Sequence, residues 1–297
     1  MAVLQTGTLQ LPNEIAGKVI AKVRETSTIA RLAPESAGTS LLNDQYELVT
    51  TDPEAEVIGE SIAKTQMDYA TTPVISANHK AVVTLRFSRE ALYADEDTQL
   101  GLIEDASESM AAAVSRALDY IVYHAVSPKG AAPIQGAVAL SAAANQQAAT
   151  SDPVADVDAL PDAIIEAGYN VTGIALATKY ANQLRKARIG SDERRAFPDI
   201  PLNVRDAGSL DGIAVAVSGT VNGDLITPAT GIQAFAGDFA KLRWGIVRAI
   251  PTRLIEYGDP DNTGHDLQGY NEIALRHEVI FKTAVIDPLA FTVLKSA

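Results

Sequence analysis

Residues 237–294 decide the fold, and they read GDFAKLRWGIVRAIPTRLIEYGDPDNTGHDLQGYNEIALRHEVIFKTAVIDPLAFTVL. A Gly-Asp-Phe turn opens the stretch, and an aromatic and basic strand follows at Trp244. After an acidic loop around Asp259, Ile273 and Leu275 alternate with polar or small residues. The stretch closes on the sequence Asp-Pro-Leu-Ala-Phe at 287–291. This order predicts mainly strand, with a half-buried ribbon that is polar on one face.

The segment upstream, from about residue 154, predicts a unit of mixed helices and strands. A first helix places Val157, Leu160, Ile164 and Ile165 inward. A strand at 172–177 follows, and Thr178 is suited to cap the next helix. Residues 188–198 are charged and bounded by Gly and Pro, which predicts an exposed loop before strands at 213–217 and 232–235.

A long helix is predicted over residues 98–125, because apolar residues recur there at steps of three and four. Its length would be roughly 40 Å at 1.5 Å per residue, which suggests a strut. Asp95, Glu96 and Asp97 precede it, where the helix dipole favours negative charge. The Ala-, Gln- and Asn-rich stretch that follows, up to Pro153, predicts a mobile or partner-facing connection.

The N-terminal part predicts an arm and a projecting hairpin. Residues 1–13 are polar and small, and a short helical run through Ile15, Val19 and Val23 is expected to end at 27–34. Strand patterns lie around residues 46–50 and 83–87, with a polar excursion between them at about 51–80. The excursion has too few large apolar residues for a core of its own, so we expect it to lie on something else.

Composition narrows the function classes. The chain has 297 residues, is 47% hydrophobic, carries a formal charge of −13 and contains no cysteine. The acidic balance disfavours charge-driven binding to nucleic acid, and the missing cysteines exclude disulfides and thiolate sites. No apolar run approaches the roughly 20 residues that span a bilayer, and no signal-peptide order is present. We expect a globular protein made and kept in a cytoplasm.

Catalytic and metal-binding motifs are weak. The four histidines, at 79, 124, 265 and 277, have no zinc-like spacing, and we find neither a nucleophile elbow nor a phosphate-binding glycine loop. Residues 259–264 resemble the start of an EF-hand loop, but Tyr270 stands where the twelfth-position Glu would be. The sequence therefore predicts no enzyme, no cofactor and no metal site. Lys and Arg residues near the arm leave non-specific contact with phosphate open.

A second set of motifs, joined to the C-terminal one, resembles a known family. It comprises Glu56-Val57-Ile58-Gly59-Glu60-Ser61, Thr72-Pro73-Val74, the apolar strand at 80–87, and Ser88-Arg89-Glu90-Ala91-Leu92. Further matches are Gly237-Asp238-Phe239, Leu275-Arg276-His277-Glu278 and Asp287-Pro288-Leu289-Ala290-Phe291. In this order, over nearly the whole chain, they are similar to the major capsid proteins of tailed phages, which have the Hong Kong 97 type fold.

The resemblance implies an α+β fold in named parts. These are an N-terminal arm (1–40), an extended β-hairpin loop (41–80), a peripheral domain with a long spine helix (81–153), a mixed α/β axial domain (154–250), return strands of the peripheral domain (251–280) and a return to the axial domain (281–297). It also implies self-assembly into pentamers and hexamers of an icosahedral shell around double-stranded DNA. Lys64 lies where some members carry a cross-linking lysine, but no motif identifies its partner.

Partners and contacts follow from the same resemblance. The partners would be copies of the chain itself, a separate scaffolding protein, a portal, possible decoration proteins and, non-specifically, packaged DNA, with no membrane. The location would be the virion, after assembly in the host cytoplasm. We expect the loop to grip its neighbours through Val57, Ile58, Ile62 and Met67, and the arm through Ile15, Val19 and Ile20.

Two other functions stay open from the sequence alone. An encapsulin-like nanocompartment uses the same fold to enclose enzymes instead of DNA. A small metal-dependent hydrolase or calcium-binding enzyme, built around Asp259, Asp261 and His265, belongs to another class. A particle that contains nucleic acid would favour the phage, and a monomer that loses activity on Asp261→Ala would favour the hydrolase.

Overall fold

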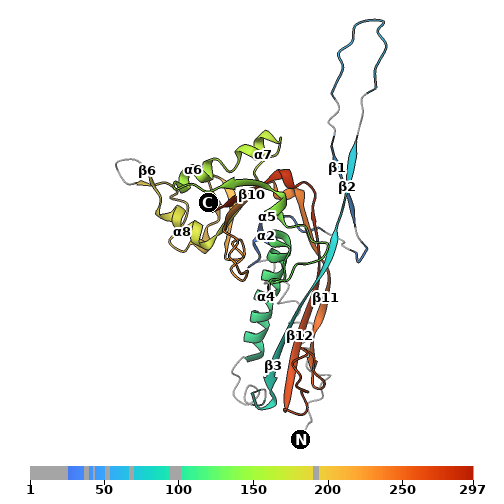
Figure 1. The fold of residues 1–297 in the computed structure, drawn as a ribbon, viewed down its shortest axis with the longest axis vertical. Helices are drawn as coiled ribbons and strands as arrows, with labels where there is room; N and C mark the ends of the chain where they lie inside the picture. Colours follow the sequence, from blue (N-terminus) through green and yellow to red (C-terminus); the bar gives the residue numbers. More distant parts are fainter. Residues whose placement is uncertain are drawn as a thin grey trace.

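The protein is elongated, with a hairpin that projects beyond two packed regions in the computed structural model (Figure 1). The structure describes residues 26–36, 40–42, 44–50, 54–66, 70–91, 93, 102–189 and 194–296. One packed region is a long helix on a three-stranded sheet, and the other is a six-stranded sheet with short helices. The mixed α+β architecture predicted from the sequence is confirmed.

The three-stranded sheet forms the long part of the molecule. Its strands β3 (Ala77–Ser88), β11 (Leu242–Ile255) and β12 (Glu272–Val285) are antiparallel, in the order β11-β12-β3. Helix α4 (Leu102–His124) runs along one face, where Ala106 and Met110 pack on Leu275. These strands have apolar residues at every second position, and the helix has them at every third or fourth, so their apolar faces can pack together.

The six-stranded sheet has the strand order β4-β13-β10-β5-β9-β8. Its strands are β4 (Asn145–Ala148), β5 (Gly173–Ala177), β8 (Ser209–Leu210), β9 (Ile213–Ser218), β10 (Ile232–Gly237) and β13 (Phe291–Lys295). The pairs β5–β9 and β13–β4 are parallel, and the other pairs are antiparallel. Every residue of β5 is buried, as expected for a central strand covered on both faces.

Short helices surround this sheet. They are α2 (Thr28–Leu32), α5 (Leu140–Ala143), α6 (Pro153–Asp158), α7 (Asp162–Glu166) and α8 (Thr178–Lys186), with 3-10 turns at Val204–Asp206, Phe239–Lys241 and Pro288–Ala290. A small hairpin of β6 (Arg188–Ile189) and β7 (Arg194–Arg195) lies at the far side of this region. None of the helices in the described ranges is long and apolar enough to cross a membrane.

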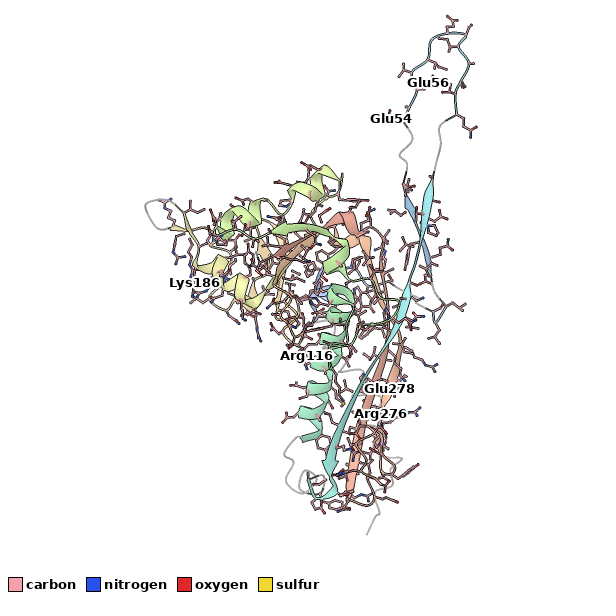
Figure 2. The ribbon with its side chains drawn as sticks, viewed as in Figure 1. Glu54, Glu56, Arg116, Lys186, Arg276 and Glu278 are labelled. Atoms are coloured by element: carbon pink, nitrogen blue, oxygen red, sulfur yellow. The ribbon has the colours of Figure 1, made fainter. Side chains whose placement is uncertain are left out.

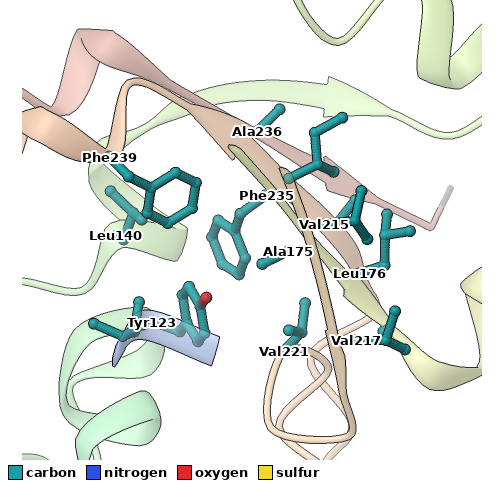
Figure 3. Packing of buried hydrophobic residues seen from close by; sticks show 14 of the residues in the cluster. Tyr123, Leu140, Ala175, Leu176, Val215, Val217, Val221, Phe235, Ala236 and Phe239 are labelled. Carbon is teal, nitrogen blue, oxygen red and sulfur yellow. The ribbon is translucent and has the colours of Figure 1, made fainter. Parts of the chain in front are cut away.

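One hydrophobic core joins the two regions. The ring of Tyr123, near the end of α4, stacks on Phe235 of β10 with centroids 4.6 Å apart (Figure 3). The same cluster includes Phe281 of β12 and Trp244 of β11, both fully or almost fully buried. Because helix and sheets share this core, the spine helix is held rigidly to both regions.

The described residues of the projecting hairpin form no core of their own. Within the described part of the chain, strands β1 (Gln45–Val49) and β2 (Thr71–Ile75) pair only with each other, with Tyr46 opposite Val74. Beyond them the chain continues as a loop that includes the described residues 54–66 (Figure 1). A two-stranded hairpin is marginally stable alone, so this one depends on its root and on whatever covers it.

Four details differ from the sequence-based expectations. The stretch 126–153 is not simply a mobile connection, because it forms α5 and an edge strand, β4, that pairs with β13. The helix predicted around residues 157–165 is split into α6 and α7 at Pro161, and Ile165 is exposed. Thr178 does not cap α8, because Ala177 holds the cap position and makes no side-chain bond.

The fourth difference lies at the predicted end of the N-terminal helix. Residues 27–34 do not simply terminate a helix: Ser27 caps α2, which begins at Thr28. The helical run predicted through Ile15, Val19 and Val23 lies outside the described residues. Ser27 is buried, its hydroxyl donates to Asp119 of α4 at 2.5 Å, and its side chain accepts from the amide of Ala30 in α2.

Candidate assembly surfaces

The loop at the end of the hairpin exposes apolar side chains far from the core. Val57 is 98% exposed and Ile62 is 59% exposed, while Ile58 is half-buried. The side chain of Glu56 accepts bonds from the amide of Thr65 at 3.3 Å and from its hydroxyl at 2.5 Å, which tie the two sides of the loop together. The loop thus presents large apolar groups while keeping a defined shape.

The hairpin strands themselves are open on both faces. Tyr46, Leu48 and Val74 are half-buried on one face, and Val49 and Ile75 are exposed on the other. Acidic residues accompany them, and Figure 2 shows Glu54 and Glu56 on the loop, well away from the rest of the chain. Two-sided exposure of apolar residues is typical of a segment that becomes covered by another molecule.

The predicted contact residues are only partly placed. Val57, Ile58 and Ile62 lie in the described part of the loop, where Val57 and Ile62 are exposed and Ile58 is half-buried. Met67 of the loop, and Ile15, Val19 and Ile20 of the arm, lie outside the described residues. The contacts that these seven residues make with neighbours therefore stay predictions.

A buried carboxylate holds the root of the N-terminal segment. Asp119 of α4, 1% exposed, accepts bonds from the hydroxyl of Ser27 (2.5 Å), from the amide and hydroxyl of Thr28 (3.3 and 3.0 Å), and from the amide of Ile29 (3.2 Å). The hydroxyl of Thr220, in the turn after β9, donates to the same carboxylate at 2.6 Å. One side chain thus caps the first turn of α2 and joins three distant segments.

The surroundings of Asp119 act on its pKa in two opposite directions. Burial raises the pKa of this carboxyl above its ordinary value, and hydrogen bonds from Ser27, Thr220, Ile29 and Thr28 act against that rise. All of these groups donate hydrogen bonds, and the carboxylate of Asp119 is the acceptor that they share. A cluster of this kind stabilises one arrangement of the three segments, because the bonds to Asp119 are lost when the segments separate.

Trp244 fixes the same root from the other side. Its indole Nε1 donates to the carbonyl of Ala33 at 3.0 Å, and its own carbonyl accepts from the amide of Ser36 at 2.8 Å. Ile29 is fully buried between these contacts and the spine helix. The point where the N-terminal segment leaves the core is therefore defined by both polar and apolar contacts.

The acidic loop between β11 and β12 is arranged around an arginine side chain. Nε of Arg86, on β3, donates to both carboxylate oxygens of Asp261 at 2.8 and 2.9 Å. Its terminal nitrogens reach Glu272 at 3.0 Å, Asp259 at 2.6 Å and the hydroxyl of Thr263 at 2.8 Å. Forked contacts of this kind use the planar guanidinium group fully.

This geometry gives the EF-hand-like stretch a structural role. Asp259 and Asp261 both bind Arg86, and the ring of His265 stacks on Tyr270 with centroids 4.4 Å apart. Across the described ranges, no group of three or more metal-ligating side chains is assembled. The site suggested for a hydrolase or a calcium ion is thus organised around the charge of Arg86.

We expect Arg86→Met to destabilise this end of the sheet, since three carboxylates would lose their shared cation. Hydrogen bonding to Arg86 lowers the pKa of Asp261, so this carboxylate contributes fully to stability above its ordinary pKa of 3.8, and the contribution is lost as the pH falls from there through the lowered pKa of the folded state. Thermal melts should show a lower midpoint for the variant at pH 7 and a smaller loss than in the wild type on acidification. Equal melting curves at both pH values would contradict this role.

The sequence did not reveal the role of three charged residues that join distant segments. Asp119, Arg86 and Lys282 act through partners 92, 175 and 238 positions away in the chain. His124, expected as a packing residue on the helix stripe, is buried, and its Nε2 lies 2.9 Å from the carbonyl of Thr220. No local pattern marks the three charged residues, because each lies in an ordinary strand or helix sequence.

Comparisons with known proteins agree with this architecture. The family model described as the phage capsid family matches residues 7–296. A solved chain from Mycobacterium phage Ogopogo is similar at 32% identity, with 92% of each chain covered and a TM-score of 0.82. A chain from Gordonia phage Cozz is also 32% identical, with coverage of 92% of this chain and 87% of that one and a TM-score of 0.77.

A more distant structure shares the fold. The capsid of an empty GTA particle is 14% identical over 91% of this chain and 90% of that chain, with a TM-score of 0.60. Comparison with curated protein sequences gave no match. The match over nearly the whole length, the two relatives at 32% identity and the spine, sheets and hairpin together lead to one conclusion: the chain belongs to the phage capsid family and is a major capsid protein with the Hong Kong 97 type fold.

Proposed function

We propose that copies of this chain assemble into the pentamers and hexamers of a closed icosahedral shell around the double-stranded DNA of a tailed phage. The observation that carries this proposal is the hairpin with its loop, which extends outside the subunit and leaves Val57 and Ile62 in water. The free energy of the system falls when a second molecule covers these apolar side chains and removes them from water. The repeated partner that a shell supplies is another copy of the same chain.

The energetics favour many modest contacts. Covering apolar surface yields about 25 cal/mol per Å², and a standard interface buries about 1,600 Å² in total. A subunit in a closed shell makes several such contacts at once, so weak single contacts add up to a stable particle. In this proposal Val57, Ile58, Ile62 and Met67 supply the loop contacts, and Ile15, Val19 and Ile20 supply the arm contacts.

The division into arm (1–40), extended loop (41–80), peripheral domain (81–153 and 251–280) and axial domain (154–250 and 281–297) belongs to this proposal. The long helix on the three-stranded sheet supports the peripheral unit, and the six-stranded sheet supports the axial one. The pairing of β4 with β13 favours moving residues 140–148 into the axial unit.

The remaining partners are proposed from the same function. Capsid membership places the protein in the virion, and assembly would take place in the host cytoplasm. A separate scaffolding protein, a portal and possible decoration proteins would act with it. The formal charge of −13 would keep packaged DNA from adhering strongly to the shell, so contact with DNA would be weak and non-specific.

A single exposed residue tests the loop. We expect Val57→Asp to prevent shell formation, because a carboxylate would be buried unpaired at the interface, while Val57→Thr keeps the branched shape at that position and should assemble more readily. Val57 is almost fully exposed, so neither change should alter the melting temperature of the subunit. Negative-stain electron microscopy and size-exclusion chromatography measure the outcome; normal shells from Val57→Asp would contradict the assignment of the loop.

Cargo distinguishes the phage capsid from the encapsulin-like nanocompartment. Assembled particles from infected or induced cells should contain double-stranded DNA and occur with a portal. Two similar chains come from phages, which favours DNA as the cargo. Particles that hold an enzyme and no nucleic acid would instead support the nanocompartment.

A further inference from the structure

Lys282 is a buried cation at the place where the hairpin joins the body of the protein. It lies on β12, the central strand of the three-stranded sheet, opposite Asn78 on β3 and Gly245 on β11. Only 3% of its side chain is exposed. A buried ammonium group is costly without partners, so its surroundings should reveal what it holds.

Both partners of the ammonium group belong to the chain that enters the hairpin. Nζ of Lys282 donates to the carbonyl of Leu42 at 2.6 Å and lies 2.9 Å from Oδ2 of Asp44. Asp44 immediately precedes β1. A side chain of the central strand thus binds the incoming segment directly.

The returning strand is tied to the same point. The amide of Asp44 donates to the hydroxyl of Ser76 at 2.7 Å, and the amide of Ser76 donates to the carbonyl of Asp44 at 2.9 Å. Next to it, the side-chain amide of Asn78 donates to the carbonyl of Leu41 at 2.7 Å. The two passages of the chain and Lys282 therefore form one polar joint at the root of the hairpin.

Apolar packing does not replace this joint. Leu41 is 57% exposed and Leu42 is 81% exposed, so these two side chains do not anchor the incoming segment by hydrophobic packing. Among the strands that the structure describes, β1 and β2 pair only with each other. The polar contacts of Lys282, Ser76 and Asn78 are therefore the described side-chain bonds that hold the root of the hairpin to the sheet.

We propose that Lys282 is a positioning residue, whose ammonium group sets the direction in which the hairpin leaves the subunit and thereby aims the loop at a neighbouring copy. The hairpin acts as a lever with its joint at Asp44 and Ser76. Removing the joint leaves the strands paired but lets them swing as a unit. The subunit then keeps its fold and loses the geometry that assembly requires.

Lever geometry shows why a small change at the root has a large effect at the loop. From Asp44 to Glu60 is a separation of 16 residues, which spans at most roughly 50 Å at about 3.3 Å per extended residue. A swing of about 10° would then displace the loop by up to roughly 9 Å. Apolar contacts extend only about 4–4.5 Å between heavy atoms, so such a swing separates the loop from any partner surface.

Spin-label distances test the joint in the isolated subunit. The chain has no cysteine, so Glu54→Cys on the loop and Lys186→Cys at the end of α8 can be labelled specifically. We expect a narrow distance distribution in the wild type and about a twofold broader one in Lys282→Met, because the hairpin samples more orientations. An unchanged distribution in Lys282→Met overturns the proposal.

Lys80→Met is the matched control. Lys80 lies on the same face of the sheet as Lys282, and its side chain, 50% exposed, pairs with Glu278. In the part of the chain that the structure describes, Lys80 makes no hydrogen bond or ion pair with the hairpin root. The Lys80→Met variant should keep the narrow distance distribution.

Two further variants grade the effect. Lys282→Arg retains the charge and should restore part of the wild-type width. Asp44→Asn should broaden the distance distribution less than Lys282→Met does. If Lys282→Met fails to fold, Asp44→Asn against Lys80→Met decides the question.

The second readout is assembly, and only this readout rests on the proposed function. We expect the shell yield of Lys282→Met to fall by at least about tenfold, since every subunit repeats the misplaced contact. Normal shells together with a broadened distribution would overturn the link between hairpin direction and assembly. Wild-type protein that forms no shells would instead contradict the proposed function, and the distance measurement would still decide the role of Lys282.

Discussion

Replacing residues 51–69 with an Asn-Gly turn is expected to give a folded subunit that no longer forms shells. The new turn would join Thr50 to Ala70, which are already bonded by an amide-to-carbonyl contact of 2.9 Å. Asn-Gly favours the tight turn that matches the twist of two antiparallel strands, so β1 and β2 should keep their register. The change removes the exposed loop residues, including Val57 and Ile62, and leaves the core untouched.

Two measurements check this expectation. Circular dichroism and thermal melting should give values close to those of the wild type, because the removed side chains contribute little to the folded monomer. Sedimentation velocity and negative-stain microscopy, with any scaffolding protein supplied, should show particles for the wild type and small species for the variant. Shells of normal size from the shortened hairpin would show that the loop is not an assembly element.

The second large effect is expected from Asp119→Ala at the root of the N-terminal segment. The substitution removes the shared acceptor of Ser27, Thr28, Ile29 and Thr220. The hydroxyls of Thr28 and Thr220 keep Tyr123 and Ser218 as neighbours, whereas the hydroxyl of Ser27 and the amide of Ile29 lose the acceptor that Asp119 supplied. Unpaired buried donors cost about 1–3 kcal/mol each, and partial rearrangement limits the total to about 3–5 kcal/mol. That is a large part of the free energy of unfolding, which is about 5–15 kcal/mol for a typical domain.

Denaturant unfolding measures this loss, with a control on the same helix. Asp105→Ala changes the same residue type on α4 at an exposed position and should shift the midpoint little. Thr220→Val removes a single donor to Asp119 and should cost about 1 kcal/mol. A loss in Asp119→Ala no greater than that in Asp105→Ala would mean that the buried cluster does not stabilise the root.

The regular elements were predictable because their residues repeat with a definite period. Val83 and Leu85 alternate with polar residues, and both pack on the inner face of β3 against the spine helix. The helix stripe through Met110 and Val114 likewise corresponds to buried side chains of α4. A period of two or of 3.6 places one face of an element toward a core, whatever the partner is.

The short or edge elements were harder to predict. The segment at 145–148 contains Asn, Gln and Ala, a composition that favours no strand, and it becomes one because β13 offers it a free edge. Pro161 interrupts a run that otherwise has helical spacing, and the two short helices that result pack separately. In both places tertiary pairing outweighs local preference.

By itself the sequence determined the types and order of the long helix and the long strands, the scarcity of large apolar residues in the hairpin loop and the likeness to phage capsid proteins. Only the tertiary structure decided which charges meet: Lys282 with Asp44, and Arg86 with Asp259 and Asp261. The physical reason is the separation along the chain over which each kind of signal acts. Apolar periodicity reports on neighbours one strand step or one helical turn away, whereas an ion pair is selected among 37 acidic residues by how distant segments pack.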